Sequence, residues 1–327
     1  MRIGIGLPAA VPDADAAVLG EWAATGERDG FASVGVIDRL VYDNLDPLIA
    51  LAAAAARTDR IELLTTVLTV PYRRNAVVLA KQLASVDRLS GSRLTAGLAL
   101  GGWPEDYEAS DVPRRNLGPT MDAMLATMRN VWDGEVIGAS GPMPALPPGR
   151  PALLFGGFAP AAFERAAAIG DGWVAPSFGY EPLVEGIAAV TQAWASAGRP
   201  GRPRVVVERY FSFGDGADET ADHYLAHYYG ADYFAAVRAD TPTDRAHLAA
   251  ELERLRDAGC DDVILLPCSD DIGQLGLLAD ALDDVGASRA TGHTEPRAES
   301  ASVHLPGAAA PSGARSVRCL SVGSGDR

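Results

Sequence analysis

Positive charge is in short supply in this sequence. Lys and Arg together number 28 against 43 Asp and Glu, which gives a formal net charge of -15 at pH 7. Nucleic acids and anionic membrane surfaces bind proteins through basic side chains that neutralise phosphate. We therefore expect neither of them as a partner, and we expect the ligands of this chain to be small molecules.

Cysteines and long apolar segments are also scarce. Cys260, Cys268 and Cys319 are odd in number and lack the spacing of metal ligands or disulfides, which is typical of reduced thiols in the cytoplasm. The longest uncharged apolar stretch, residues 47–56, is too short to span a bilayer. Residues 1–6 do not resemble the apolar region of a secretion signal. We therefore expect a cytoplasmic protein without a membrane segment.

What the sequence does contain is a regular alternation of short apolar runs with longer amphipathic stretches. Such alternation predicts repeated βαβ units and a parallel sheet. The expected strands are Arg2–Leu7, Ser33–Ile37, Ile61–Thr66, Leu94–Leu100, Ala152–Phe155, Trp173–Ala175, Arg204–Phe211 and Asp262–Leu266. Eight strands with helices between them predict an α/β fold of the (β/α)8 TIM barrel type, whose active site lies at the C-terminal ends of the strands.

The boundaries of this barrel follow from the connections and from a change in composition. The connections 101–119 and 214–240, after the fourth and seventh strands, and also 134–151, are longer than such loops need to be, and long loops usually carry function. After about residue 286 large apolar residues become rare. We therefore expect a barrel over 1–286 and a disordered low-complexity tail over 287–327.

One helix has local signals at both ends. Thr241 and Pro242 are suited to the N-cap and the first helical position, and Gly259 is suited to the C-terminal stop. The sequence therefore predicts an outer helix that begins at Thr241 and ends before Gly259.

Two segments at predicted strand ends are candidate functional sites. Asp38 and Arg39 end the second strand, where barrels carry catalytic groups, although a salt bridge at the rim explains the pair as well. Gly156, Gly157 and Phe158 lead from the fifth strand into a helix, where backbone N–H groups can bind an anion or simply form a tight turn. Position alone leaves these alternatives open.

Residues 223–234 contain two histidines and several aromatic side chains. His223 and His227 have the spacing of one helix face but no further ligand nearby, so we expect no metal site. The aromatic residues of this segment predict packing, with the alternative that they roof a pocket.

Seven segments of the sequence belong together as a pattern. They are GFASVGVIDR (30–39), RIELLTTVL (60–68), AKQLASVDRLSG (80–91), LALGGWPEDY (98–107), FGGFAPAA (155–162), AIGDGW (168–173) and AGCDDVILLP (258–267). Together they resemble the bacterial luciferase-like monooxygenase superfamily, a group of flavin- or deazaflavin-dependent oxidoreductases. Their order and spacing cover the expected barrel. The resemblance implies a luciferase-like barrel that binds reduced FMN, or the deazaflavin coenzyme, over the strand ends and performs two-electron redox chemistry.

The resemblance also implies roles for residues. Thr66 and Val67 would lie beneath the flavin ring, joined by a non-proline cis peptide in a bulge of the third strand. The other expected cofactor-binding residues are Gly101, Gly102 and Trp103 at the ring edge and Gly156, Gly157 and Phe158 at the phosphate. Asp38 and Arg39 would be the catalytic pair, for orientation and anion stabilisation. The expected substrate-binding residues are Tyr107, Ser177, Phe178 and Tyr210. A separate flavin reductase and a homodimer formed through outer helices are the expected partners.

Some positions depart from the pattern of the superfamily. Arg39 stands where members often have a histidine, and Phe158 where many have a serine. Leu117 and Thr120 stand where we expect phosphate-binding arginines, while the chain has arginines upstream at 114–115. Three hypotheses follow: a monooxygenase that uses reduced FMN and oxygen on an apolar organic molecule, as in secondary metabolism; a deazaflavin-dependent hydride-transfer enzyme; or a non-redox barrel that has lost flavin binding.

Overall fold

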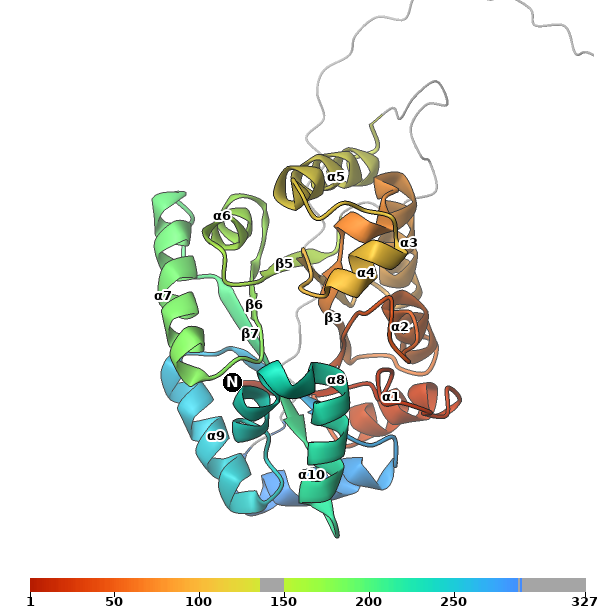
Figure 1. The fold of residues 1–327 in the computed structure, drawn as a ribbon, viewed down its shortest axis with the longest axis vertical. Coiled ribbons are helices and arrows are strands. Elements are labelled where there is room, and N and C mark those ends of the chain that lie inside the picture. Colours follow the sequence, from red (N-terminus) through yellow and green to blue (C-terminus); the bar gives the residue numbers. More distant parts are fainter. Residues whose placement is uncertain (136–149, 288, 290–327) are drawn as a thin grey trace, which may run out of the picture. The chain divides into compact units, whose positions relative to one another are not determined.

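The computed structural model describes residues 1–135, 150–287 and 289. Eight parallel strands close into a barrel in the order β1 to β8, which confirms the predicted TIM barrel (Figure 1). The strands are β1 (Arg2–Gly6), β2 (Ser33–Val36), β3 (Glu62–Thr69), β4 (Leu94–Ala99), β5 (Ala152–Gly156), β6 (Gly172–Ala175), β7 (Arg204–Phe211) and β8 (Asp262–Pro267). Every one of them overlaps a strand expected from the sequence.

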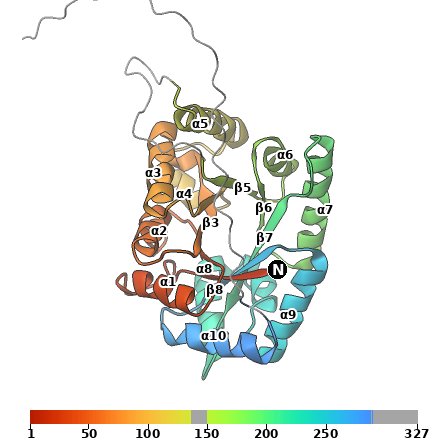
Figure 2. The same ribbon diagram turned by 180° about the vertical axis from the view of Figure 1, so that it is seen from behind.

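Helices surround the strands (Figures 1 and 2). They are α1 (Val18–Arg28), α2 (Pro47–Ala55), the 3-10 turn η1 (Pro71–Arg73), α3 (Ala76–Leu89), α4 (Pro104–Ala109), α5 (Leu117–Trp132), α6 (Pro160–Ile169), α7 (Tyr180–Ser196), α8 (Ala217–Ala239), α9 (Arg245–Ala258) and α10 (Gly273–Asp284). None of the helices in the described ranges is long and apolar enough to cross a membrane.

Apolar side chains fill the lumen of the barrel. Leu64, Leu154, Val174, Val206 and Ile264 come from five different strands and form one buried cluster. Side chains of a strand alternate between its two faces, so the neighbours of these residues point outward to the helices and form the larger core. The lumen is therefore a packed core. We call this apolar cluster the floor, because it lies below the mouth that the strand ends surround.

A bulge interrupts β3 near its C-terminal end. The register against β4 shifts between Thr65 and Leu68, and the peptide bond between Thr66 and Val67 is cis. Both features were expected from the resemblance. The Val67 side chain faces Gly156 of β5, where an added Cβ would lie only 2.8 Å from Val67 Cγ1. The absence of a side chain at Gly156 therefore makes room for Val67 at the mouth of the barrel.

The predicted start of α9 was wrong by three residues. Its N-cap is Asp244, whose carboxylate accepts a hydrogen bond from the backbone N–H of His247 at 2.8 Å. The Thr241 hydroxyl instead donates to the carbonyl of Val237 at the end of the preceding helix. The predicted stop is confirmed, because Gly259 adopts φ +91° after the last turn.

Both predicted insertions contain helices. The connection after β4 holds α4 and the connection after β7 holds α8, which has 23 residues. Most of the third long connection, 134–151, lies outside the described residues. So do Cys319 and nearly all of the tail for which the sequence predicts disorder.

Candidate functional site at the strand ends

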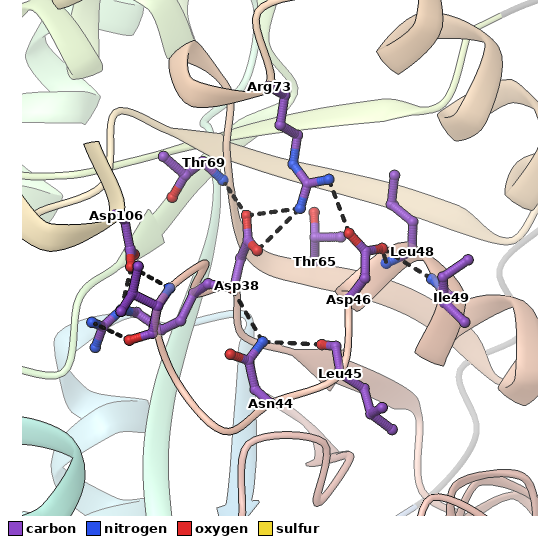
Figure 3. Close-up of polar contacts among 12 residues, drawn as sticks. Asp38, Asn44, Leu45, Asp46, Leu48, Ile49, Thr65, Thr69, Arg73 and Asp106 are labelled. Atoms are coloured by element: carbon purple, nitrogen blue, oxygen red, sulfur yellow. Dashed lines mark hydrogen bonds and ion pairs between the residues drawn. The ribbon is translucent and has the colours of Figure 1, made fainter. Parts of the chain in front are cut away.

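Asp38, at the end of β2, is tied to the end of β3. Its side chain is buried and accepts hydrogen bonds from the backbone N–H of Thr69 at 2.9 Å and from Arg73 at 3.0 and 3.2 Å (Figure 3). Arg73 also contacts Asp46, the N-cap of α2. Burial raises the pKa of Asp38, while Arg73 and Thr69 act in the opposite direction. Asp38 thus braces the loops beside the β3 bulge.

Arg39 is held by two carboxylates on the insertion after β4. Its Nε donates to Asp106 at 2.9 Å, and its terminal nitrogen donates to Glu105 at 2.7 Å. Its side chain is only 3% exposed, and the guanidinium lies 4.1 Å from the centre of the Trp103 ring. Ion pairs at the rim therefore hold both Asp38 and Arg39, and their catalytic role stays a prediction.

Aromatic side chains cover one half of the barrel mouth. We call this group the aromatic roof; it consists of Tyr224, Tyr228, Tyr229 and Tyr233 of α8 together with Trp103, Phe178 and Tyr210. Helix α8 (teal) lies on the near side of the barrel in Figure 1 and on the far side in Figure 2. It therefore lies across one end of the barrel.

The roof packs on β1, β2, β7 and β8. Its buried members share a cluster with Ala10, Ile37, Leu266 and Cys268, which follow or end those strands. The hydroxyl groups of Tyr210 and Tyr229 lie 3.0 Å apart. Burial raises the pKa of Tyr210 well above its usual value, so this phenol stays neutral. The inner layer of the roof is therefore buried, whereas Tyr233 at its outer edge is exposed.

The other half of the mouth remains accessible. The half-buried or exposed residues there are Val67 on β3, Leu100, Gly101 and Gly102 after β4, Gly156, Gly157 and Phe158 at the end of β5, and Pro176 after β6. Four of these are glycines, and a Cβ added at Gly102 would meet no atom within 4 Å. A rim that is half glycine, beside an aromatic wall, leaves space in which the edge of a flat ring can approach the backbone closely.

The predicted substrate-binding residues fall in two groups. Phe178 and Tyr210 belong to the aromatic roof, and the rings of Phe178 and Tyr233 are centred 5.3 Å apart. Tyr107 lies elsewhere, with its ring against Tyr72 and its hydroxyl donating to the carbonyl of Leu100. Ser177 is buried and donates to the carbonyl of Glu208 at 3.0 Å. The structure therefore brings Phe178 and Tyr210 together and keeps Tyr107 apart from them.

Glu208 is a polar residue of the lumen that sequence reasoning missed. It is 8% exposed, and its Oε1 has no hydrogen-bond partner among the described residues. Burial raises the pKa of Glu208 to about 8, against the lowering effects of Thr66 and Arg209. The only signal in the sequence was an acidic residue directly after the apolar run Val205–Val207, within a strand whose other residues after Arg204 are also buried.

Metal ligands do not gather in the described part of the chain, where no three His, Cys, Asp or Glu side chains form a group that could hold an ion. The ring of His227 instead accepts or donates a hydrogen bond with the Tyr42 hydroxyl at 2.7 Å. This contact joins α8 to the loop after β2.

Comparison with protein families decides the membership of this chain. The model that describes luciferase-like monooxygenases matches residues 1–283, which is nearly the whole described structure. The chain belongs to this family. Proteins that share its fold include a monooxygenase and an F420-dependent reductase.

Two curated proteins are similar in sequence to about half of this chain. An uncharacterized protein of Mycobacterium tuberculosis is 31% identical over 173 residues, which cover 50% of this chain and 60% of that protein. The 5,10-methylenetetrahydromethanopterin reductase of Methanolobus tindarius is 28% identical over 169 residues, which cover 50% of this chain and 51% of that protein. The chain thus spans less than two thirds of the length of these relatives.

Solved structures of other proteins share the fold. The monooxygenase RslO1 from Streptomyces bottropensis superimposes with a TM-score of 0.72 at 22% identity, over 87% of this chain and 99% of that one. An F420-dependent secondary alcohol dehydrogenase superimposes with a TM-score of 0.73 at 17% identity, over 87% and 98%. At these identities the likeness extends to the fold alone.

Proposed function

We propose that this protein is a flavin-dependent monooxygenase that uses reduced FMN and oxygen to oxidise an apolar organic small molecule. The observation that carries the proposal is the divided mouth of the barrel, with an apolar aromatic roof on one half and a glycine-rich, accessible rim on the other. Oxygen activation by a reduced flavin needs a site from which water is excluded. The roof supplies such a site next to a rim that admits a flat ring.

Different residues at the rim would bind different parts of the cofactor. The bound flavin would supply the two electrons of the reaction. Val67 would support the ring from below, Gly101 and Gly102 would let its edge approach the backbone, and residues 156–158 would hold the phosphate through backbone N–H groups. The guanidinium of Arg39 would stabilise negative charge that develops beside the ring.

A deazaflavin-dependent reductase is the second candidate. It is favoured by the similarity to the reductase of Methanolobus tindarius and to the F420-dependent secondary alcohol dehydrogenase. The same rim would hold the deazaflavin ring, because that ring is also flat and tricyclic. The two candidates differ in one observable respect, since only the monooxygenase consumes oxygen.

Titration of the purified full chain with FMN, reduced FMN and the deazaflavin coenzyme tests both candidates. Fluorescence and melting temperature are followed, because a ligand that binds only the folded state raises the melting temperature in a saturable way. We expect reduced FMN to stabilise the protein and oxygen uptake to follow when an apolar substrate is added. Stabilisation by the deazaflavin coenzyme alone selects the reductase. Stabilisation by none of the three leaves the non-redox barrel.

Two partners belong to the same proposal. We expect a separate flavin reductase to deliver the reduced FMN, so the assay is run with chemically reduced FMN and again with a reductase and its nicotinamide donor. A homodimer formed through outer helices is checked by sedimentation at the concentrations of the titration.

A further inference from the structure

Glu208 lies in the lumen between two layers of different chemistry. Val206, two residues earlier on β7, belongs to the apolar cluster of the floor, and Tyr210, two residues later, belongs to the aromatic roof. Side chains two residues apart on a strand point to the same face, so all three face the lumen. The carboxyl group is therefore placed below the roof and above the floor.

The Glu208 side chain also faces the opposite wall of the barrel. The hydroxyl of Thr66 on β3 interacts with its carboxyl and lowers its pKa. In a closed ring of eight strands, β3 and β7 stand opposite each other. Glu208 thus faces, across the lumen, the residue that begins the cis peptide of the bulge, directly beneath the proposed position of the flavin ring.

The lack of a cationic partner sets Glu208 apart from the other buried glutamates. Glu62 contacts Arg204 at 2.7 Å, and Glu251 contacts Arg209 at 2.6 Å. Both pairs satisfy the rule that buried charges are paired. Glu208 has no such ion pair in the described ranges, and its Oε1 has no hydrogen-bond partner there, so this oxygen is free to meet a ligand.

The ionisable groups that act on Glu208 are few. The phenols of Tyr210, Tyr228 and Tyr229 face it from β7 and α8, and burial keeps all three neutral. The neighbouring Arg209 side chain points to the outer face of β7, where it pairs with Glu251. The raised pKa thus favours a protonated Glu208 in the ligand-free protein below about pH 8, while the Thr66 hydroxyl donates to the carbonyl of Val36 at 3.3 Å.

We propose that Glu208 is the catalytic acid and base of this site and that it exchanges a proton with the ligand bound at the strand ends. This inference rests on the proposed function, in which the electrons come from a reduced flavin-type cofactor. In the step, the O–H bond of the carboxyl group breaks and an O–H or N–H bond forms on the ligand atom that gains electron density. The carboxylate that remains takes a proton from solvent when the product leaves.

Calorimetry of cofactor binding tests the inference without turnover. The wild-type full chain and Glu208→Gln are titrated under argon with reduced FMN, and with the deazaflavin coenzyme, in buffers of different ionisation enthalpy from pH 6 to 10. We expect the wild type to exchange a fraction of one proton per site, with a pH dependence around pH 8 that Glu208→Gln lacks. The matched control Glu253→Gln, on the exposed face of α9, keeps the wild-type behaviour.

Kinetics supply a second readout. Glu208→Gln is expected to lower kcat by about 10²- to 10⁴-fold with little change in KM, because general acid–base catalysis contributes that much. Glu208→Asp, which keeps a carboxyl group, is expected to restore part of kcat and the limb of the pH profile near 8. A purely structural role would move the melting temperature and leave this limb in place.

Each outcome has a separate meaning. Equal proton exchange in the wild type and Glu208→Gln overturns the role of Glu208 and leaves the proposed function standing. Failure of every cofactor to bind either protein overturns the proposed function, and the inference with it. If Glu208→Gln does not fold, the infrared spectrum of the ligand-free wild type decides. A protonated carboxyl band that disappears between pH 6 and 10 supports the inference, and its absence contradicts it.

Discussion

Asp38 and Arg39 are adjacent in the chain and opposite in charge, yet each is paired with a different part of the molecule. Asp38 binds Arg73 and the backbone of β3, whereas Arg39 binds the acidic residues at the start of α4. A strand end that is fixed on both sides holds its loops in one geometry. This rigidity positions the rim even where the pair itself does not touch a ligand.

Replacement of Arg73 by alanine tests this bracing. The Asp38 side chain is 1% exposed, so the substitution leaves a buried carboxylate without its cation. Breaking a buried pair in this way costs about 3–5 kcal/mol in the free energy of unfolding. The control Arg57→Ala removes an exposed pair with Glu21 and is expected to change that free energy by about 0–1 kcal/mol. Urea unfolding of both variants measures the difference, and equal small losses would contradict the bracing role.

A second prediction concerns the pH dependence of stability. The pKa of Glu208 is raised in the folded protein, from 4.5 to about 8, so the folded state holds a proton that the unfolded chain releases. The stabilising contribution is therefore complete below about pH 4.5 and is lost as the pH rises to about 8. At about 1.4 kcal/mol per pKa unit, the loss is on the order of 5 kcal/mol.

Chemical denaturation of the wild type and Glu208→Gln between pH 4.5 and 9 measures this loss. The free energy of unfolding of the wild type is expected to fall across this range more steeply than that of the variant. Buried Asp38 contributes in the same direction in both proteins, so the difference between the two curves isolates Glu208. Parallel curves would show that the carboxyl of Glu208 does not titrate in this range.

At the scale of elements, α8 has an unusual shape for a helix that covers a site. Gly230 has φ +63° and ψ −175°, which breaks the helix between Tyr229 and Tyr233. The break gives the two halves of α8 different directions, and both halves bring tyrosines to the roof.

Gly230→Ala tests the importance of this break. A Cβ at Gly230 meets no atom within 4 Å, so the cost is purely conformational, because this backbone region is almost restricted to glycine. We expect a loss of about 1–3 kcal/mol in the free energy of unfolding. Gly276→Ala in α10 is the matched control: its Cβ also meets open space, but its backbone is helical, so a gain of about 0.4–1 kcal/mol is expected. Thermal unfolding distinguishes the two.

The strands could be predicted from the sequence and α8 could not, for a physical reason. Each strand is a short run of buried residues bounded by polar turns, and that pattern is visible without the fold. The tyrosines of α8 that belong to the roof lie on both sides of the break at Gly230. The apolar residues of this helix therefore do not form one continuous stripe in the sequence. The cap of α9 was predicted wrongly because Thr241 and Asp244 are both suitable cap residues, and only the packed end of α8 decides between them.

At the scale of the whole molecule, the two ends of the barrel are built from different chemistry. Arg2, Glu62, Arg204 and Asp262 form ion pairs across four strands at the N-terminal end. The C-terminal end has the aromatic roof and the glycine-rich rim. Stability and function are therefore separated along the barrel axis, as in other barrels of this type.

Glu62→Gln tests the separation. Its carboxylate is buried and pairs with Arg204 and Arg2, so the loss of its charge leaves these two cations with Asp262 alone and costs about 3–5 kcal/mol in the free energy of unfolding. Cofactor affinity is expected to stay unchanged, because the proposed site lies at the opposite end. Asp122→Asn, which breaks a pair on the surface with Arg165, is expected to change stability by less than about 1 kcal/mol. Urea unfolding and cofactor titration of the same samples measure both quantities, and a weaker affinity in Glu62→Gln would contradict the separation.

The place of the candidate site in the fold could be inferred from the sequence more readily than the side chains that face it. Asp38, Gly101 and Gly156 end strands, and the fold brings all strand ends to one face. Glu208 could not be found in this way, because an acidic residue in a strand faces either the helices or the lumen. The closed barrel shows which face each side chain takes: Glu208 points into the lumen, and its neighbour Arg209 points outward to Glu251.

The division of the mouth into a covered half and an open half makes the two faces of a bound molecule unequal. A substrate that enters over β3 to β6 has the wall of α8 on one side and solvent on the other, so a trigonal carbon is approached from a single direction. For the proposed oxidoreductase, we therefore expect one enantiomer in large excess whenever the reaction creates a stereocentre. Chiral chromatography of the product reads this out, and a racemic product would mean that the wall moves away during the reaction.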